Sequence, residues 1–175
     1  MMNTNMGSSE PRRRWHRLEQ GRPARVLLAE DDDEMRQMLE AELRADGYEV
    51  FAVNDGTEML EALSEVSRLP FAAPDVIVMD VRMPGYSGLH ILAALRAADW
   101  TTPVILITAF GDIRLHEEAA KLGAAVVLDK PFDVDDLRTA LLHVIGNEAG
   151  SREREGASKA EKATEALEPE PGESK

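Results

Sequence analysis

Residues 75–89 read DVIVMDVRMPGYSGL, and this stretch decides the fold. Four consecutive apolar residues from Val76 to Met79 end at Asp80, and a Pro-Gly turn then leads toward another apolar segment. A strand that is apolar on both faces is typical of a parallel sheet covered by helices on its two sides. The stretch therefore predicts a buried strand of an α/β fold, with Asp80 at its carboxyl end.

The same alternation of a short apolar run and a helical period occurs five times along the chain. Val104 to Ile107 is apolar throughout, whereas Met35, Leu39 and Leu43 repeat at helical spacing before Gly47. The pattern predicts strands at 25–29, 48–53, 75–79, 104–108 and 125–128, with helices at 33–44, 57–69, 89–97, 113–122 and 134–145. Five such units predict a doubly wound α/β fold, in which a five-stranded parallel sheet carries five helices.

Composition sets the boundaries of this domain. Residues 1–23 are rich in Gly, Ser, Pro and Arg without an apolar period, so we expect a disordered, basic N-terminal arm. Residues 148–175 are rich in Glu, Ala, Lys and Ser, so we expect a disordered, acidic and Ala-rich C-terminal tail. The folded domain is expected at residues 24–147.

The net charge of −13 lies in the centre of the chain. Residues 1–24 have five Arg against two Glu, or +3, and residues 147–175 have five Lys or Arg against eight Glu, or −3. Residues 25–146 therefore carry −13 by themselves. A domain this acidic repels a phosphate backbone, so we expect no DNA binding by the folded domain and favour a bound cation.

Two absences restrict the function further. The sequence has no cysteine, which excludes thiol catalysis, disulfides and cysteine metal sites. It has no apolar run long enough to span a bilayer, and no signal-peptide pattern. We therefore expect a cytoplasmic protein without membrane attachment.

Polar side chains follow several predicted strands at the point where each strand ends. In open parallel sheets the ligand site lies at the carboxyl ends of the strands, where the strand order reverses. The candidates are Glu30 and Asp31 after the first strand, Asp80 after the third, Thr108 after the fourth, and Asp129 and Lys130 after the fifth. Because clustered carboxylates repel one another, a hard cation with oxygen ligands would relieve the repulsion. The sequence therefore predicts a Mg²⁺ site.

Four segments together resemble the receiver domains of response regulators. They are LLAEDDDEMRQML at 27–39, DVIVMDVRMPGYSGL at 75–89, VILITAFGD at 104–112 and GAAVVLDKPF at 123–132. The resemblance covers residues 25–146 and implies the flavodoxin-like receiver fold. It implies a phosphorylation-dependent switch of two-component or phosphorelay signalling that is not a turnover enzyme, although it promotes its own phosphorylation and dephosphorylation. We expect a stand-alone receiver, because no output domain is recognisable.

The same resemblance implies the chemistry of the site. Asp80 would accept a phosphoryl group from a histidine kinase or a histidine phosphotransfer protein, while Lys130 and Thr108 would contact the phosphoryl oxygens. The Mg²⁺ ligands would be Glu30, Asp31, Asp80 and the main-chain carbonyl of Arg82. Pro131 is the candidate for a cis peptide bond with Lys130.

The resemblance also implies how the switch works. Thr108 would move toward the phosphoryl group and change the face around Val127, which an unidentified downstream protein would read. Receivers commonly have an aromatic residue at the position of Val127, so the usual aromatic movement is not expected here. Arg82 and Phe110 flank the path of the attacking water and are expected to modulate dephosphorylation. We expect a monomer or a weak dimer.

Three other functions would place different requirements on these residues. A pseudo-receiver that only binds proteins stays open, since it has the same residues. A hydrolase of the haloacid dehalogenase type would need an aspartate at the position of Arg82, and a flavin protein would need amides rather than acids after the first strand. We expect the basic arm to be solvated, and we expect no ligand role for the four histidines, His16, His90, His116 and His143.

Overall fold

The structure is a computed structural model that describes residues 22–68, 73–109 and 113–146. The expectations for Phe110, for the C-terminal tail and for most of the N-terminal arm lie outside these residues. Strands and helices alternate along the described chain, from β1 (Arg25–Ala29) and α1 (Asp33–Ala45) through β2 (Glu49–Val53), α2 (Gly56–Arg68), β3 (Val76–Asp80), α3 (Gly88–Ala97), β4 (Val104–Thr108), α4 (Ile113–Lys121) and β5 (Val126–Asp129) to a last helix at 134–146. The expected fold class is confirmed.

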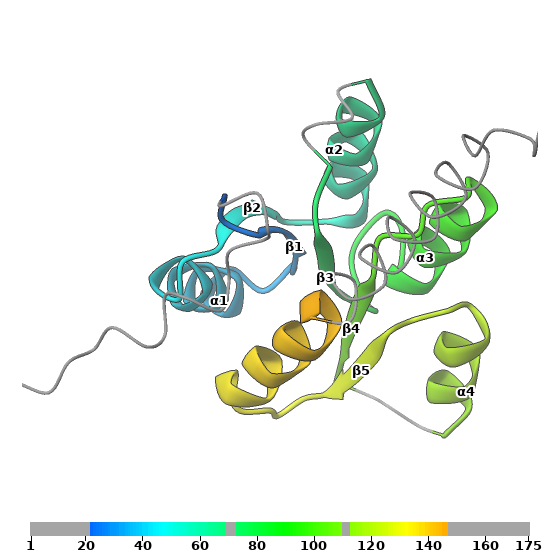
Figure 1. The fold of residues 1–175 in the computed structure, drawn as a ribbon. Helices are drawn as coiled ribbons and strands as arrows, with labels where there is room; N and C mark the ends of the chain where they lie inside the picture. The colour runs from blue at the N-terminus through cyan, green and yellow to red at the C-terminus, as the bar shows by residue number, and fades with distance from the viewer. Residues whose placement is uncertain (1–21, 69–72, 110–112, 147–175) are drawn as a thin grey trace, which may run out of the picture.

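The five strands form one parallel sheet in the order β2-β1-β3-β4-β5. The chain leaves β1 toward the β2 edge and returns to β3 on the other side of β1, so the strand order reverses between β1 and β3 (Figure 1). The register places Ala29 beside Met79, the residue before Asp80. The carboxyl ends of these two strands therefore lie next to each other.

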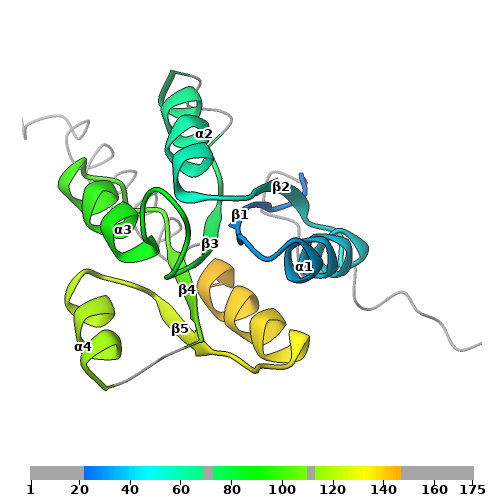
Figure 2. The ribbon, with the colours of Figure 1, turned by 180° about the vertical axis from the view of Figure 1, so that it is seen from behind.

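Helices cover both faces of the sheet, as Figures 1 and 2 show from opposite sides. Alternate residues of each strand face opposite helix layers because strand side chains have a period of two. One apolar core lies between the sheet and the helices α1 and 134–146. It contains Val26, Leu28 and Val78 from the sheet and Leu39, Leu43, Leu137 and Leu141 from the helices. The other apolar core lies between the sheet and α2, α3 and α4. It contains Leu27, Ile77 and Met79 from the sheet and Met59, Ile91, Leu92 and Ala119 from the helices.

The helix that follows β1 begins and ends with local signals. Asp32 caps α1, since its carboxylate accepts a hydrogen bond from the Met35 amide at 2.8 Å. Gly47, just after the last turn, has a φ of +98°, a conformation that glycine adopts without a steric penalty. These signals fix the direction in which the chain leaves Glu30 and Asp31, so they position the loop that carries both acids.

The predicted boundaries differ from the observed ones by one residue at several elements. β3 begins at Val76 rather than Asp75. The Asp75 side chain accepts hydrogen bonds from the Arg22 guanidinium and from the Arg25 amide. Among the helices of the described ranges, none is long and apolar enough to cross a membrane.

Candidate functional site

The candidate site lies at the carboxyl edge of the sheet, where the strand order reverses. Glu30 directly follows β1, Asp80 is the last residue of the neighbouring strand β3, and Lys130 directly follows β5. Glu30 is fully buried and Asp80 is 5% exposed. Two acids this deeply buried need a cationic partner, because an isolated carboxylate is poorly solvated inside a protein.

Lys130 provides that partner for both acids. Its Nζ donates to Asp80 Oδ2 at 2.5 Å and to both carboxylate oxygens of Glu30 at 2.9 Å. The Lys130 side chain is itself only 18% exposed, so the three groups form an ion cluster largely shielded from water. The ammonium therefore bridges the ends of β1 and β3.

The cluster shifts the pKa values of two of its members. Burial, opposed by the hydrogen bond from Lys130, raises the pKa of Glu30 above its ordinary value, and the nearby charge of Asp80 raises it further. Burial lowers the pKa of Lys130, but the hydrogen bonds and charges of Asp80 and Glu30 outweigh it and leave a raised pKa. Lys130 thus stays an ammonium, which keeps a positive charge beside Asp80.

A third acid, Asp31, completes a group that fits a hard metal ion. Carboxylate oxygens of Glu30, Asp31 and Asp80 all lie within 4.8 Å of one another. Asp31 is exposed, so the group opens to solvent on one side. Mg²⁺ prefers a few carboxylate ligands with carbonyls and waters, and this donor set meets that preference.

Main-chain bonds hold the two buried acids in place. The Arg82 amide donates to Asp80 Oδ1 at 2.7 Å, which fixes the carboxylate and directs its other oxygen toward Lys130. The Arg36 guanidinium donates to the carbonyl oxygen of Glu30 at 2.9 Å. Arg82 itself is exposed, so its side chain lies at the rim of the site.

A glycine is required beside Asp80. A Cβ atom on Gly88, the first residue of α3, would lie 2.5 Å from the carbonyl oxygen of Asp80 and 3.1 Å from Cα of Val81. Both neighbours are backbone atoms that cannot turn aside as a side chain can. The start of α3 therefore packs directly against the strand end that carries Asp80.

The two predicted switch residues lie on the neighbouring strands β4 and β5. Thr108 is fully buried at the end of β4, and its carbonyl accepts a hydrogen bond from the Lys130 amide at 2.7 Å. Val127 lies on β5 opposite Leu106 and packs in the core shared with α4. The peptide bond between Lys130 and Pro131 is cis.

One expectation from the sequence is wrong. Asp129 does not join the acidic cluster, although it directly precedes Lys130. It lies 3.0 Å from Nε2 of His116 on α4 and is 54% exposed. Successive side chains of an extended chain point to opposite faces, so Asp129 faces α4 while Lys130 faces the acids.

The fold and this ion cluster together define a receiver domain. Residues 26–142 match the response regulator receiver domain family, and the chain belongs to this family of phosphorylation-dependent signalling domains in two-component systems. Receiver domains bind Mg²⁺ at an acidic pocket, and this chain has the corresponding acidic group.

Individual relatives match the domain to different extents. The chain is 29% identical over 117 residues to sporulation initiation phosphotransferase F of Bacillus subtilis, which covers 67% of this chain and 90% of that protein. It is 35% identical over 113 residues to regulatory protein AtoC of Escherichia coli, and this match covers 65% of this chain and 23% of AtoC. It is 35% identical over 136 residues to transcriptional regulatory protein FixJ of Bradyrhizobium diazoefficiens, and this match covers 78% of this chain and 60% of FixJ. The match thus spans less than two thirds of AtoC and FixJ.

Solved structures of response regulators also resemble this chain. The receiver domain of Francisella response regulator 1452 superposes with a TM-score of 0.64 at 29% identity, covering 71% of this chain and 98% of that one. The chemotaxis response regulator CheY4 of Vibrio cholerae superposes with a TM-score of 0.60 at 33% identity, covering 69% and 98%.

Proposed function

We propose that Asp80 accepts a phosphoryl group from a histidine kinase or a histidine phosphotransfer protein, and that Mg²⁺ assists the transfer. The observation that carries this proposal is the Lys130 ammonium, which lies between Asp80 and Glu30. Phosphoryl transfer spreads negative charge over the equatorial oxygens, and catalysis consists mainly of positioning and neutralising that charge. A fixed carboxylate beside a buried ammonium meets both requirements.

The residues of the chain have separate parts in this step. Asp80 Oδ2 forms the new bond to phosphorus while the bond from phosphorus to the donor histidine nitrogen breaks, and the electron pair of that bond leaves with the nitrogen. The Arg82 amide keeps Oδ1 in place. The Lys130 ammonium then contacts a phosphoryl oxygen instead of the carboxylate alone.

A Mg²⁺ ion held by Glu30, Asp31, Asp80 and the Arg82 carbonyl would neutralise charge on the carboxylates and on the phosphoryl oxygens. The three carboxylates bring more negative charge than the single Lys130 ammonium can balance, which favours a second cation at this place. The donors are all oxygen atoms, as this ion prefers.

The signal would leave the site through β4 and β5. The hydroxyl of Thr108 would bond a phosphoryl oxygen, and the packing of Val127 in the α4 side of the core would change with it. Val127 has no aromatic ring to rotate, so the rearrangement would be one of packing. A partner protein would read the altered surface formed by α4 and β5.

The test is phosphorylation of the full chain by acetyl phosphate, followed by intact-mass spectrometry. We expect one added phosphoryl group with Mg²⁺, none with EDTA, and none in the Asp80→Asn variant. Asp129→Asn is the matched control, since Asp129 also ends a strand but faces His116, and it should be phosphorylated like the parent. An unmodified parent would contradict the proposal and favour the pseudo-receiver interpretation.

A further inference from the structure

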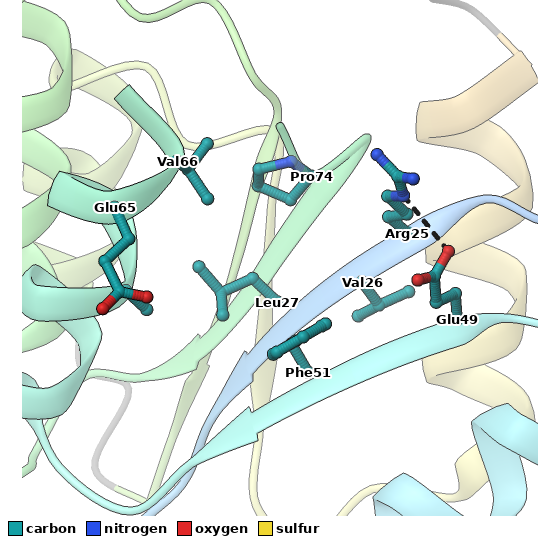
Figure 3. Close-up of a pocket in the computed structure, with 9 residues that line it drawn as sticks. Arg25, Val26, Leu27, Glu49, Phe51, Glu65, Val66 and Pro74 are labelled. Carbon is teal, nitrogen blue, oxygen red and sulfur yellow. Dashed lines mark hydrogen bonds and ion pairs between the residues drawn. The ribbon is translucent and has the colours of Figure 1, made fainter. Parts of the chain in front are cut away.

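A pocket unrelated to the acidic cluster lies between β1, β2 and α2, on the β2 edge of the sheet (Figure 3). Its volume is about 220 Å³. Its apolar wall consists of Val26, Leu27, Phe51, Ala62, Val66 and Pro74. A cavity of about 150 Å³ already admits a benzene molecule, so this pocket has room for an aromatic side chain.

One exposed apolar side chain, that of Phe51, borders this pocket. Phe51 lies on the edge strand β2 and is 68% exposed, and in Figure 3 its ring lies along one side of the pocket. Edge strands have unpaired main-chain groups, and proteins usually cover or charge them. An apolar pocket beside an edge strand therefore indicates a surface that another segment covers.

The described chain begins next to this pocket. The Arg22 guanidinium bonds both carboxylate oxygens of Asp75, at 2.8 and 3.0 Å. Asp75 follows the pocket residue Pro74. Its carboxylate also accepts a hydrogen bond from the main-chain amide of Arg25, which is another pocket residue. Trp15 precedes Arg22 by seven residues, and an extended chain of that length reaches about 25 Å. Residues 12–18 can therefore reach the pocket without leaving the anchor at Asp75.

The charges of the two surfaces are complementary. The pocket rim carries Glu49 and Glu65. Glu49 pairs with Arg25 at 3.1 Å, whereas Glu65 makes no ion pair with the residues that the structure describes. Residues 1–21 carry four Arg against two Glu, and the four arginines, Arg12, Arg13, Arg14 and Arg17, all flank Trp15. The segment therefore combines an aromatic side chain for the apolar wall with cations for the acidic rim.

We propose that the N-terminal segment at residues 12–18 docks on its own domain, with the Trp15 side chain in the pocket and the flanking arginines beside Glu65. The docked segment covers the Phe51 edge of β2. Because this pocket lies on α2 and β2, the docking is independent of phosphorylation chemistry at Asp80.

The first test uses ¹H–¹⁵N NMR spectra of the full chain. Replacing Trp15 by Ala removes an indole ring current, so amides that lie against the ring change their shifts. We expect the largest changes at Phe51, Ala62 and Val66 in Trp15→Ala, and none there in Met6→Ala, the control in the same arm. Absence of shifts at these three residues in Trp15→Ala overturns the proposal.

The second test measures acrylamide quenching of Trp15 in a Trp100→Phe background, so that one indole emits. We expect the quenching constant to rise about twofold or more in Glu65→Lys, because the docked population falls when the rim charge is reversed. The control is Glu118→Lys on α4, an exposed glutamate on another helix, and it should leave quenching unchanged. Equal quenching in all three proteins overturns the proposal.

A dilution series distinguishes docking of the segment on its own domain from docking on a second copy of the chain. An intramolecular contact gives the same pocket shifts and the same quenching at every protein concentration. Shifts that fade on dilution would place Trp15 on another molecule and would overturn docking within one chain. Higher salt should increase quenching of Trp15, because the contacts between the arginines and the rim are exposed to solvent.

Discussion

Replacing Lys130 by Met is expected to destabilise the fold and to make its stability depend on Mg²⁺. The change keeps an apolar stem but leaves Glu30, which is fully buried, and Asp80, which is 5% exposed, without their ammonium. Removing one partner of a buried ion pair costs about 3–5 kcal/mol. Glu30 can take up a proton to relieve part of this cost, so we expect a loss of about 2–4 kcal/mol at neutral pH.

Urea unfolding of the full chain in EDTA measures this loss. Lys121→Met on α4 is the matched control, because Lys121 is exposed and a surface change of this kind costs less than about 0.5 kcal/mol. Adding Mg²⁺ should restore much of the stability of Lys130→Met, because the cation replaces the missing charge; binding at about 100 times Kd contributes about 2.7 kcal/mol. Equal urea midpoints for the parent and Lys130→Met in EDTA would refute the reasoning.

The pH dependence of this loss follows from the same cluster. Burial raises the pKa of Glu30, and removal of the Lys130 ammonium raises it further. The folded variant then binds more protons than its unfolded chain, so its stability increases as the pH falls from the raised pKa of Glu30 toward the ordinary pKa of a glutamate. The difference between the parent and Lys130→Met should therefore narrow at acidic pH. In a Glu30→Gln background, Lys130→Met should cost less, because one buried carboxylate is already neutral.

Three further substitutions test the packing of α3, the contact between Arg22 and Asp75, and the hydroxyl of Thr108. Gly88→Ala should cost about 1–3 kcal/mol in urea unfolding, because the new Cβ meets the Asp80 carbonyl oxygen at 2.5 Å. Asp75→Ala should cost about 1–3 kcal/mol in the same assay, since it leaves the Arg22 guanidinium and an amide of β1 without their acceptor. Thr108→Ala should still be phosphorylated by acetyl phosphate, but the NMR shift changes that beryllofluoride with Mg²⁺ causes along β5 should shrink.

For each of the three substitutions, one result would contradict the prediction. Gly88→Ala with parental stability would show that α3 can move away from β3. Parental stability in Asp75→Ala would mean that the anchor at Arg22 contributes nothing. Unchanged β5 shifts in Thr108→Ala would remove the hydroxyl from the switch, while leaving the phosphoacceptor role of Asp80 unaffected.

The fold was predictable because its signals are local and repeated. Val76 to Met79 and Val104 to Ile107 are apolar on both faces, which is typical of a sheet covered on two sides. The boundaries were less predictable, since they depend on partners far away in sequence. At the start of β3, for example, the Asp75 carboxylate accepts hydrogen bonds from Arg22 and Arg25, which lie 53 and 50 positions away.

The acidic cluster was also largely predictable, because topology brings the carboxyl ends of β1 and β3 together. Sequence position alone could not separate Lys130 from Asp129, which are neighbours that face opposite sides. It also gave no sign of the pocket at β2, which depends on how side chains from three elements pack around Phe51. Side-chain direction and packing are properties of the folded chain.

Asp80, and no other carboxylate, is proposed to carry the phosphoryl group. Borohydride reduces an acyl phosphate to an alcohol and so converts a phosphorylated aspartate into homoserine, which peptide mass spectrometry can locate. After treatment of the full chain with acetyl phosphate and Mg²⁺, we expect homoserine at position 80 alone. Homoserine at position 31 or 129, or at no position, would show that Asp80 is not the phosphorylated residue.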